Sequence, residues 1–210
     1  NCKYSDATVF SFHPVKIITT AEGGLVTTNN QKIADRIRLL RAHGITKDSG
    51  LMSKVAEGDW YYEQIHLGYN YRMTDLQAAL GISQMERLDE FVSKRHALFK
   101  RYNSSLHKSI NKPFQLPESY SSFHLYPIQV AEKTRKKVFN ELRKNGIGVQ
   151  VHYIPIHTHP FYKKFGFMEG DFPNSVNYYK RSMSLPLYAG LDFKLQDEVI
   201  NVINETLDKI

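Results

Sequence analysis

A single lysine, Lys16, stands in a setting that could give it chemistry. It follows a β-branched and aromatic stretch at residues 8–12 and a proline, and its neighbours Val15, Ile17 and Ile18 are apolar. Burial among apolar side chains lowers the pKa of a lysine, and the neutral amine is the nucleophile that Schiff-base chemistry needs. The alternative is an ordinary lysine at the end of a strand with its ammonium group in water, as in most proteins.

Three histidines, His152, His157 and His159, lie close enough in the sequence to raise the question of a metal site. Neutral imidazoles can ligate zinc. The chain has one cysteine, Cys2, no paired carboxylate lies nearby, and Pro155 interrupts any regular ligand geometry. We therefore predict no metal site, and the single cysteine suits a reducing compartment.

The elements that must position these residues are short strands and longer helices. Residues 8–12 and 25–28 read as strands, with Gly23 and Gly24 forming the turn before the second. A helix is expected from Asn29 and Asn30 to a stop at Gly44, and residues 45–67 read as a long irregular loop around Trp60, Tyr61 and Tyr62. That aromatic cluster could stack on a nucleotide base or simply pack on its own domain.

A second helix begins at Thr74, which can cap it, and its apolar stripe is expected to continue to about Leu106. A domain boundary is placed near residues 87–91, giving domains of 1–88 and 89–210. Beyond it we expect strands at 123–131 and 147–154 and helices at 133–144 and 193–207, which together make a small α/β unit.

The composition is that of an ordinary globular protein, and its charge favours anionic partners. Of 210 residues 41% are hydrophobic and 23% charged, and 28 Lys and Arg against 21 Asp and Glu give a net charge of +7. A nucleic-acid binder is one interpretation, suggested by the basic run at 133–137. It is disfavoured because Glu132 and Glu141 interleave with those cations, as on a solvated helix face.

No apolar run approaches the roughly 20 residues that span a bilayer, so no membrane association is expected. The first residues lack a basic leader with an apolar core and do not begin with Met. We therefore expect a cytoplasmic protein of which this chain is a part.

Five segments together resemble the DegT/StrS family of sugar aminotransferases, which are pyridoxal-phosphate enzymes. They are FSFHPVK with ITTAEGGLVTT, RLLRAHG, GYNYRMTDLQAALG, HYIPIH and SLPLY, in the family's order and spread over essentially the whole chain. The resemblance implies an α/β fold, the C-terminal half of a fold-type I PLP-dependent transferase. Residues 1–88 would be the remainder of the large PLP-binding domain, and residues 89–210 the small domain.

The resemblance also implies roles for individual residues. Lys16 would be the catalytic lysine that forms the Schiff base with pyridoxal 5'-phosphate and moves the proton, and Ser11 would bind the cofactor phosphate. Asn70 would reach the phosphate in the partner subunit of a homodimer with shared active sites, and Arg72 would face the substrate of that same site. His152 and His157 would approach the sugar nucleotide. Without the resemblance, Ser11, Asn70 and Arg72 would read as ordinary strand and loop residues.

The activity implied is transfer of an amino group from L-glutamate to a keto group on a nucleotide-linked sugar. The wording of the segments is most similar to the enzymes that aminate UDP-linked 4-keto-6-deoxy hexoses in pseudaminic acid biosynthesis, a route to bacterial surface glycans. Family members that dehydrate sugars carry histidine in place of the lysine, and Lys16 stands against that reaction.

Enzymes of this family are roughly twice as long, and the missing half is expected to be N-terminal. It would supply the ring that stacks on the pyridine, the carboxylate that pairs with the pyridinium nitrogen and much of the phosphate cup. An alternative is therefore a catalytically inactive remnant, or one half of a split enzyme, that acts as a dimerisation or structural partner. Exposed apolar faces left by the missing half predict a self-associating chain.

Overall fold

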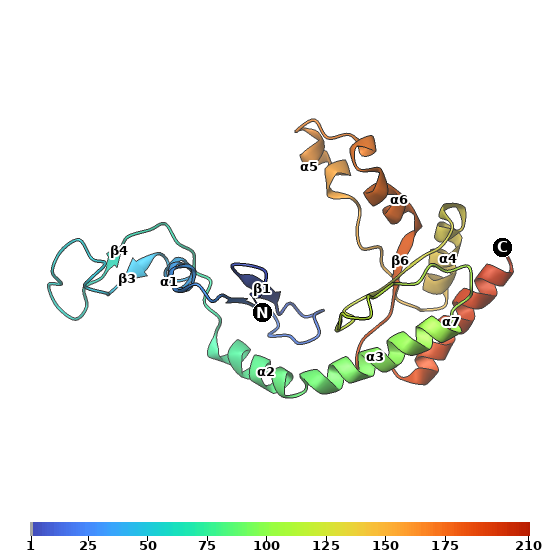
Figure 1. Ribbon diagram of the computed structural model, residues 1–210, viewed down its shortest axis with the longest axis horizontal. Coiled ribbons are helices and arrows are strands. Elements are labelled where there is room, and N and C mark those ends of the chain that lie inside the picture. Colours follow the sequence, from blue (N-terminus) through green and yellow to red (C-terminus); the bar gives the residue numbers. More distant parts are fainter. Residues whose placement is uncertain (1) are drawn as a thin grey trace. The chain divides into compact units, whose positions relative to one another are not determined.

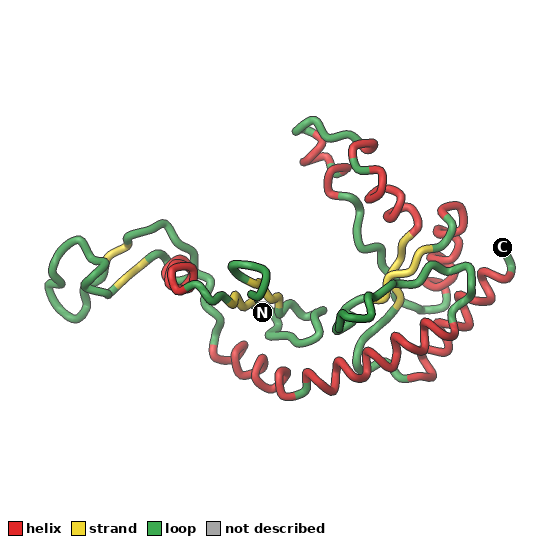
Figure 2. Tube along the Cα trace, in the orientation of Figure 1, coloured by secondary structure: helices red, strands yellow, loops and turns green. Residues whose placement is uncertain are grey.

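The computed structural model describes residues 2–210, and contacts along the chain divide it into two compact units. The first unit ends at Leu88 and the second spans Asp89–Ile210. The first unit consists largely of loops joined to short strands and helices, whereas helices dominate the second (Figures 1 and 2).

The first unit begins with a β-hairpin. Strands β1 (Thr8–Ser11) and β2 (Gly24–Thr27) pair antiparallel, with Phe10 opposite Leu25 and Ser11 opposite Gly24. The loop between them, residues 12–23, carries Lys16. This confirms the two strands expected from their β-branched and aromatic residues.

Two helices of the first unit begin at the caps that the sequence indicates. The side chain of Asn30 accepts hydrogen bonds from the amides at the start of α1 (Gln31–Leu40). Thr74 and Gln77 form a reciprocal capping box at the start of α2 (Asp75–Glu86). Between the helices lie the short antiparallel strands β3 (Ile45–Thr46) and β4 (Glu63–Gln64).

The first unit has no apolar core of its own among the described residues. Every buried apolar side chain lies between Val92 and Ile203, in the second unit. Helix α2 carries apolar side chains on several sides, yet Leu76 and Ile82 are exposed. A helix that is apolar on more than one side is normally buried.

The second unit is built on a small antiparallel sheet. Strand β5 (Tyr126–Gln129) pairs with β6 (Ser182–Leu185), and single bridges join Asn111 to Gln129 and Gln150 to Ser184. Four segments therefore lie in the order 111, β5, β6, 150. The remaining elements are α3 (Leu88–Ser105), α4 (Glu132–Lys144), 3-10 helices at Ile156–Thr158 and Glu169–Asp171, α5 (Pro160–Lys163), α6 (Pro173–Arg181) and α7 (Phe193–Asp208).

Helices and sheet of the second unit enclose one continuous core. Leu98 and Tyr102 of α3, Val138 of α4 and Ile203 of α7 are almost fully buried in it. Arg95 is also buried, and its guanidinium donates to the carbonyls of Phe123, His124 and Leu187 at 3.1, 3.2 and 2.8 Å. The amide of Gln196 on α7 donates to the carbonyl of Leu98 at 2.8 Å.

Three expectations about elements are wrong in detail. The helix expected from Thr74 to about Leu106 is interrupted at Arg87, whose φ of −104° and ψ of 4° end α2 before α3 begins. Residues 147–154 form a single bridge at Gln150 and no strand, and residues 45–67 hold β3 and β4. Within the described residues, no helix is long and apolar enough to cross a membrane.

Candidate functional site

Lys16 lies in the loop of the β1–β2 hairpin. His13, Pro14, Val15 and Lys16 form a turn in which the Lys16 amide donates to the His13 carbonyl at 2.9 Å. The Lys16 side chain is half-buried, and within the described part of the chain its amine has no hydrogen bond or ion pair. Val15, beside it, is 63% exposed. The amine is therefore held on an ordered loop but not engaged.

Hydrogen bonds across the base fix the conformation of this loop. The amide of Phe12 donates to the carbonyl of Gly23 at 2.9 Å, and the amide of Thr20 donates to the carbonyl of Phe12 at 3.0 Å. The hydroxyl of Thr19 also donates to the Phe12 carbonyl, at 2.9 Å. These bonds set where Lys16 stands relative to the end of β1.

Ser11 is the last residue of β1 and lies at the foot of the same loop. Its side chain is exposed, and its hydroxyl accepts a long hydrogen bond of 3.4 Å from the amide of His13. The structure thus places a free amine and an accessible hydroxyl on one short connection. An amine can form an imine with an aldehyde, and a hydroxyl can donate to an anionic oxygen.

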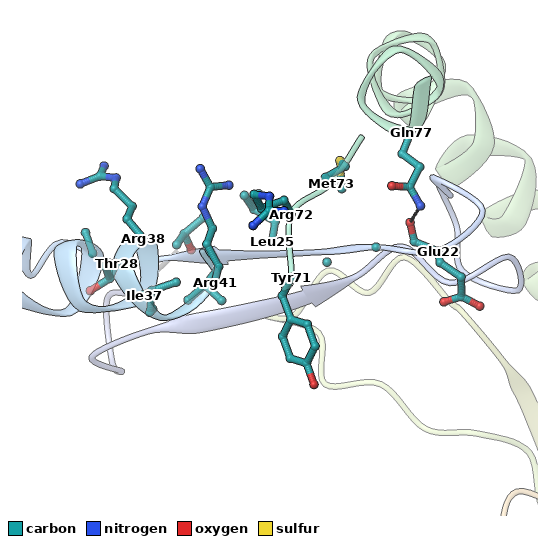
Figure 3. A pocket seen from close by; sticks show the side chains of 15 residues that line it. Glu22, Leu25, Thr28, Ile37, Arg38, Arg41, Tyr71, Arg72, Met73 and Gln77 are labelled. Atoms are coloured by element: carbon teal, nitrogen blue, oxygen red, sulfur yellow. Dashed lines mark hydrogen bonds between the residues drawn. The ribbon is translucent and has the colours of Figure 1, made fainter. Parts of the chain in front are cut away.

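The turn that leads into β2 is tightly built and touches α2. Gly23 has a φ of +156°, and a side chain there would collide with Thr20 and Met73, so this position requires glycine. The amide side chain of Gln77, in the first turn of α2, donates to the Glu22 carbonyl at 3.0 Å (Figure 3). Helix α2 therefore helps to hold the end of the Lys16 loop.

Asn70 and Arg72 lie on an extended segment beside the end of α1. The amide of Tyr69 donates to the Leu40 carbonyl at 2.7 Å, and the amide of Tyr71 donates to the Arg41 carbonyl at 2.9 Å. Both Asn70 and Arg72 are exposed. Their side chains have no hydrogen bond or ion pair within the described residues, which leaves them available to a ligand or another chain.

An open depression of about 840 Å³ lies between β2, α1 and the segment that carries Arg72. Figure 3 shows Arg38 and Arg41 projecting from α1, with Tyr71, Arg72 and Met73 passing beside them. Lys16 and Ser11 are not among its lining residues. The structure thus brings together Ser11 with Lys16 on the hairpin, and Arg72 with the two arginines of α1.

The histidines of the second unit lie in different surroundings. His152 is half-buried, and its Nδ1 lies 2.8 Å from the hydroxyl of Ser184 on β6. His157 is buried, with its ring packed edge-on against Phe172 and its Nε2 3.4 Å from the Glu169 carbonyl. Across residues 2–210, no three His, Cys, Asp or Glu side chains gather as a metal site would require.

Sequence reasoning assigned no role to Arg38 and Arg41, although it singled out the RLLRAHG segment that contains them. Two arginines three positions apart before a helix stop are a weak signal, because such residues usually face solvent. The backbone hydrogen bonds of Tyr69 and Tyr71 with the end of α1 bring Arg72 to their side.

Comparison with known proteins shows similarity along nearly the whole chain. Spore coat polysaccharide biosynthesis protein SpsC of Bacillus subtilis is 41% identical over 208 residues, covering 95% of this chain and 53% of the relative. UDP-4-amino-4,6-dideoxy-N-acetyl-beta-L-altrosamine transaminase of Campylobacter jejuni is 37% identical over 213 residues, covering 99% of this chain and 54% of the relative.

Solved structures agree. A protein of Streptococcus pneumoniae described as a sugar aminotransferase, in its PMP form, superposes with a TM-score of 0.90 at 30% identity, covering 100% of this chain and 55% of the other. PseC of Helicobacter pylori, described as an aminotransferase of pseudaminic acid biosynthesis, gives 0.87 at 30% identity, covering 99% and 54%.

The chain spans about half the length of the curated relatives it matches. Its fold is that of the fold-type I aminotransferases, as the resemblance implied. A family model matches residues 1–204, and the chain therefore belongs to the DegT/DnrJ/EryC1/StrS aminotransferase family.

Proposed function

We propose that this chain is part of a pyridoxal-phosphate enzyme that transfers an amino group from L-glutamate to a 4-keto-6-deoxy sugar carried on a nucleotide. The observation that carries the proposal is the β1–β2 hairpin, which presents the free amine of Lys16 five residues after the hydroxyl of Ser11 in a chain of this family.

The residues present fit part of a cofactor site. Lys16 would hold the cofactor through its amine, and Ser11 would donate a hydrogen bond to the phosphate. Pyridoxal phosphate, when bound, supplies the electron sink that makes the α-carbon of an amino acid acidic. The one carboxylate on the loop, Glu22, is largely exposed and lies 3.9 Å from the Nε2 of His13.

Lys16 has a second role in the proposed reaction. Its Nζ would also act as a general base that takes the proton from the α-carbon of the amino donor, which is catalysis by a positioned amine. In the second half of the reaction the same Nζ would return a proton to the carbon that loses its keto group. The loop hydrogen bonds around Phe12 and Thr20 keep the amine in place for both transfers.

A homodimer would complete the site. Asn70 and Arg72 are exposed and have no partner within the described residues, which suits side chains that serve the neighbouring subunit. In this proposal Asn70 binds the cofactor phosphate of that subunit, and Arg72 faces its substrate. Residues 1–88 would be the remainder of the large cofactor domain, and residues 89–210 the small domain, from which His152 and His157 approach the sugar nucleotide.

The substrate is proposed from the relatives. The Campylobacter jejuni transaminase acts, by its name, on a UDP-linked 4,6-dideoxy sugar, and it is 37% identical to this chain. We place the proposed reaction on the same class of sugar, in pseudaminic acid biosynthesis for bacterial surface glycans.

The test is to trap the cofactor on the chain. Purified protein is mixed with pyridoxal phosphate, reduced with borohydride and digested, and the peptides are mapped by mass spectrometry. A pyridoxyl group on Lys16, absent from Lys16→Ala and retained in Lys3→Ala, supports the proposal. Labelling spread evenly over exposed lysines contradicts it.

A second candidate is a half-enzyme or inactive remnant that serves as a dimerisation or structural partner. It is favoured by the absence of any buried apolar side chain from the described part of the first unit and by the half-length match to relatives. Folded protein with no trapping at Lys16 would support this candidate.

A further inference from the structure

Three arginines from two separate segments line one depression. Arg38 lies in the last turn of α1, Arg41 caps that helix, and Arg72 lies on the extended segment that pairs with it. Residues three positions apart on a helix are neighbours, so the first two side chains share a face. The hydrogen bond from the Tyr71 amide to the Arg41 carbonyl brings Arg72 to the same place.

The positive charge in this depression is only partly balanced. Arg38 forms an ion pair of 2.9 Å with Asp35. Arg41 and Arg72 have no ion pair or hydrogen bond of their side chains within the described residues. Glu22 also lines the depression, but its carboxylate belongs to the Lys16 loop and lies near His13. Like charges held together without anions are unfavourable, so the cluster favours an anionic ligand.

The dipole of α1 accounts for only part of this arrangement. Cations near a helix C-terminus are stabilised, typically by about 0.3–1 kcal/mol, and Arg38 and Arg41 stand there. Arg72 belongs to no helix, yet it joins them in the depression. A ligand common to the three guanidinium groups explains the whole set.

We propose that Arg38, Arg41 and Arg72 form a binding site for the diphosphate of a nucleotide-linked substrate. This inference rests on the proposed function, since it names the residues that would hold the charged part of the sugar nucleotide. Guanidinium groups bind phosphate oxygens in a two-pronged geometry, and two or more of them match the several oxygens of a diphosphate. Thr27 and Thr28 also line the depression, and the Thr28 hydroxyl there already donates to the carbonyl of Asp6 at 2.6 Å.

The exposure and the size of the site favour a diphosphate as its occupant. The three arginines are exposed, and the volume of about 840 Å³ exceeds what a single carboxylate would fill. A nucleic acid would require basic side chains extending along the surface, whereas this cluster is confined to one depression.

Equilibrium titration of the 210-residue chain with inorganic diphosphate and with UDP tests the proposal. The titration is done at fixed ionic strength and without pyridoxal phosphate or glutamate. Its result therefore does not depend on whether the cofactor can be trapped at Lys16, and failure of the titration says nothing about trapping. The variants are Arg41→Ala, Arg72→Ala and Arg41→Lys. Lys32→Ala is the matched control, because Lys32 is an exposed cation of α1 that does not line the depression.

We expect saturable binding of both probes, weakened roughly 10- to 100-fold by Arg41→Ala and by Arg72→Ala, and less than about threefold by Lys32→Ala. Arg41→Lys keeps the positive charge but loses the two-pronged guanidinium, so its loss of affinity should lie between those of Lys32→Ala and Arg41→Ala. Circular dichroism of each variant shows whether α1 remains folded, and Arg41→Lys keeps the test open if Arg41→Ala unfolds.

Three results would overturn the proposal. Equal losses in Arg41→Ala and Lys32→Ala would mean a general charge effect. If Arg41→Ala weakened the binding of inorganic diphosphate but left the affinity for UDP unchanged, the nucleotide would bind elsewhere. The absence of saturable binding of either probe would mean that the arginines have no phosphate ligand.

Discussion

At the scale of single residues, Arg95 shows how a charge can hold a fold together. Its guanidinium is buried, and its donors are shared among three backbone carbonyls from two distant segments, at 123–124 and 187. Burial lowers the pKa of Arg95 from its ordinary value, although arginine remains charged at neutral pH. The side chain therefore joins α3 to the segment just before β5 and to the segment just after β6, which meet at one end of the sheet.

Replacing Arg95 should be costly. Arg95→Met keeps an apolar stem but leaves three carbonyls without their donor, and we expect the free energy of unfolding of the second unit to fall by about 3 kcal/mol. Urea denaturation followed by far-ultraviolet circular dichroism measures it. Lys94→Met, at an exposed position on the same helix, should change stability by less than about 0.5 kcal/mol. Similar losses in the two variants would refute this role for Arg95.

Glu63 closes the long loop of the first unit. Its carboxylate accepts hydrogen bonds from the amide and hydroxyl of Ser53 at 2.7 and 3.0 Å, from the amide of Lys54 at 3.3 Å, and from the hydroxyl of Tyr61 at 3.1 Å. The bond from the Ser53 amide is the main cause that holds the pKa of Glu63 below its ordinary value. One carboxylate thus ties the middle of the loop, at Ser53 and Lys54, to its end at Tyr61.

Because the folded pKa of Glu63 is lowered, its contribution is complete above the pKa of the unfolded state and is lost as pH falls through the folded value. Protonation at low pH, or Glu63→Gln at neutral pH, should loosen the loop, with the protection of the Ser53 amide against hydrogen exchange falling roughly threefold. Trp60, the one tryptophan of the chain, reports the same change through its fluorescence anisotropy. Glu57→Gln, which removes only an exposed ion pair with Lys54, should leave both signals in place. Identical behaviour of the two variants would contradict the assignment.

At the scale of elements, a close approach of two backbones positions Asn70. Gly44, three residues after the C-cap Arg41 of α1, has a φ of +70°, and a side chain there would collide with the backbone of His66. Gly68 approaches the same turn so closely that a side chain would meet the backbone of Gly44 and His43. The two glycines let the segment with Asn70 and Arg72 lie against the end of the helix.

Gly44→Ala should therefore displace that segment. We expect the amides of His43, Tyr69 and Tyr71, which cross this junction, to lose at least about tenfold of their protection against hydrogen exchange. Gly146→Ala is the matched control, since Gly146 has a φ of +75° but open space around it. It should cost only the strain of the left-handed conformation, about 1–2 kcal/mol, at the end of α4. Unchanged protection in Gly44→Ala would show that the close approach is not needed.

Elements with local signals could be predicted from the sequence, and those that depend on distant partners could not. Asn30 and Thr74 cap α1 and α2 as expected, because a cap is set by residues two or three positions away. Strand β6 and the lack of a strand at 147–154 depend on pairing with segments far along the chain. The break at Arg87 was hidden because the apolar stripe continues through it.

The candidate site shows the same division. Lys16 and Ser11 were singled out by a resemblance carried by contiguous motifs, and the structure places both on one hairpin. The proposed role of Arg41 depends on its pairing with Tyr71, thirty positions later. The role of Glu63 depends on its hydrogen bonds with Ser53, ten positions earlier. No regular spacing in the sequence predicts such pairs.

At the scale of the molecule, the two units differ in what stabilises them. The second unit holds all the buried apolar side chains among the described residues, whereas Val9, Leu67 and Leu76 of the first are exposed. Burial of apolar surface is the main source of stability, so the first unit should open at little cost.

Hydrogen exchange followed by mass spectrometry checks this expectation. Backbone amides in α3, β5 and α7 should be protected at least about 100-fold more than those in β1, β2 and α1, since core elements open only with the whole unit. Limited proteolysis should cut before Leu88 first. Comparable protection in both units would mean that the first is stabilised by self-association, which sedimentation velocity at several concentrations would reveal.

The packing of α7 against α3 sets the order in which the second unit can form during synthesis. Gln196 contacts the Leu98 carbonyl, the side chain of Asn204 contacts the backbone of His107, and Arg101 pairs with Asp197. Helix α3 therefore cannot complete its contacts until residues almost a hundred positions later have been synthesised. A ribosome releases the chain from its N-terminus, and contacts of such long range close late and slowly. The core therefore cannot close until α7 has been synthesised, and nascent chains halted before Asp192 should remain open to chaperones and proteases.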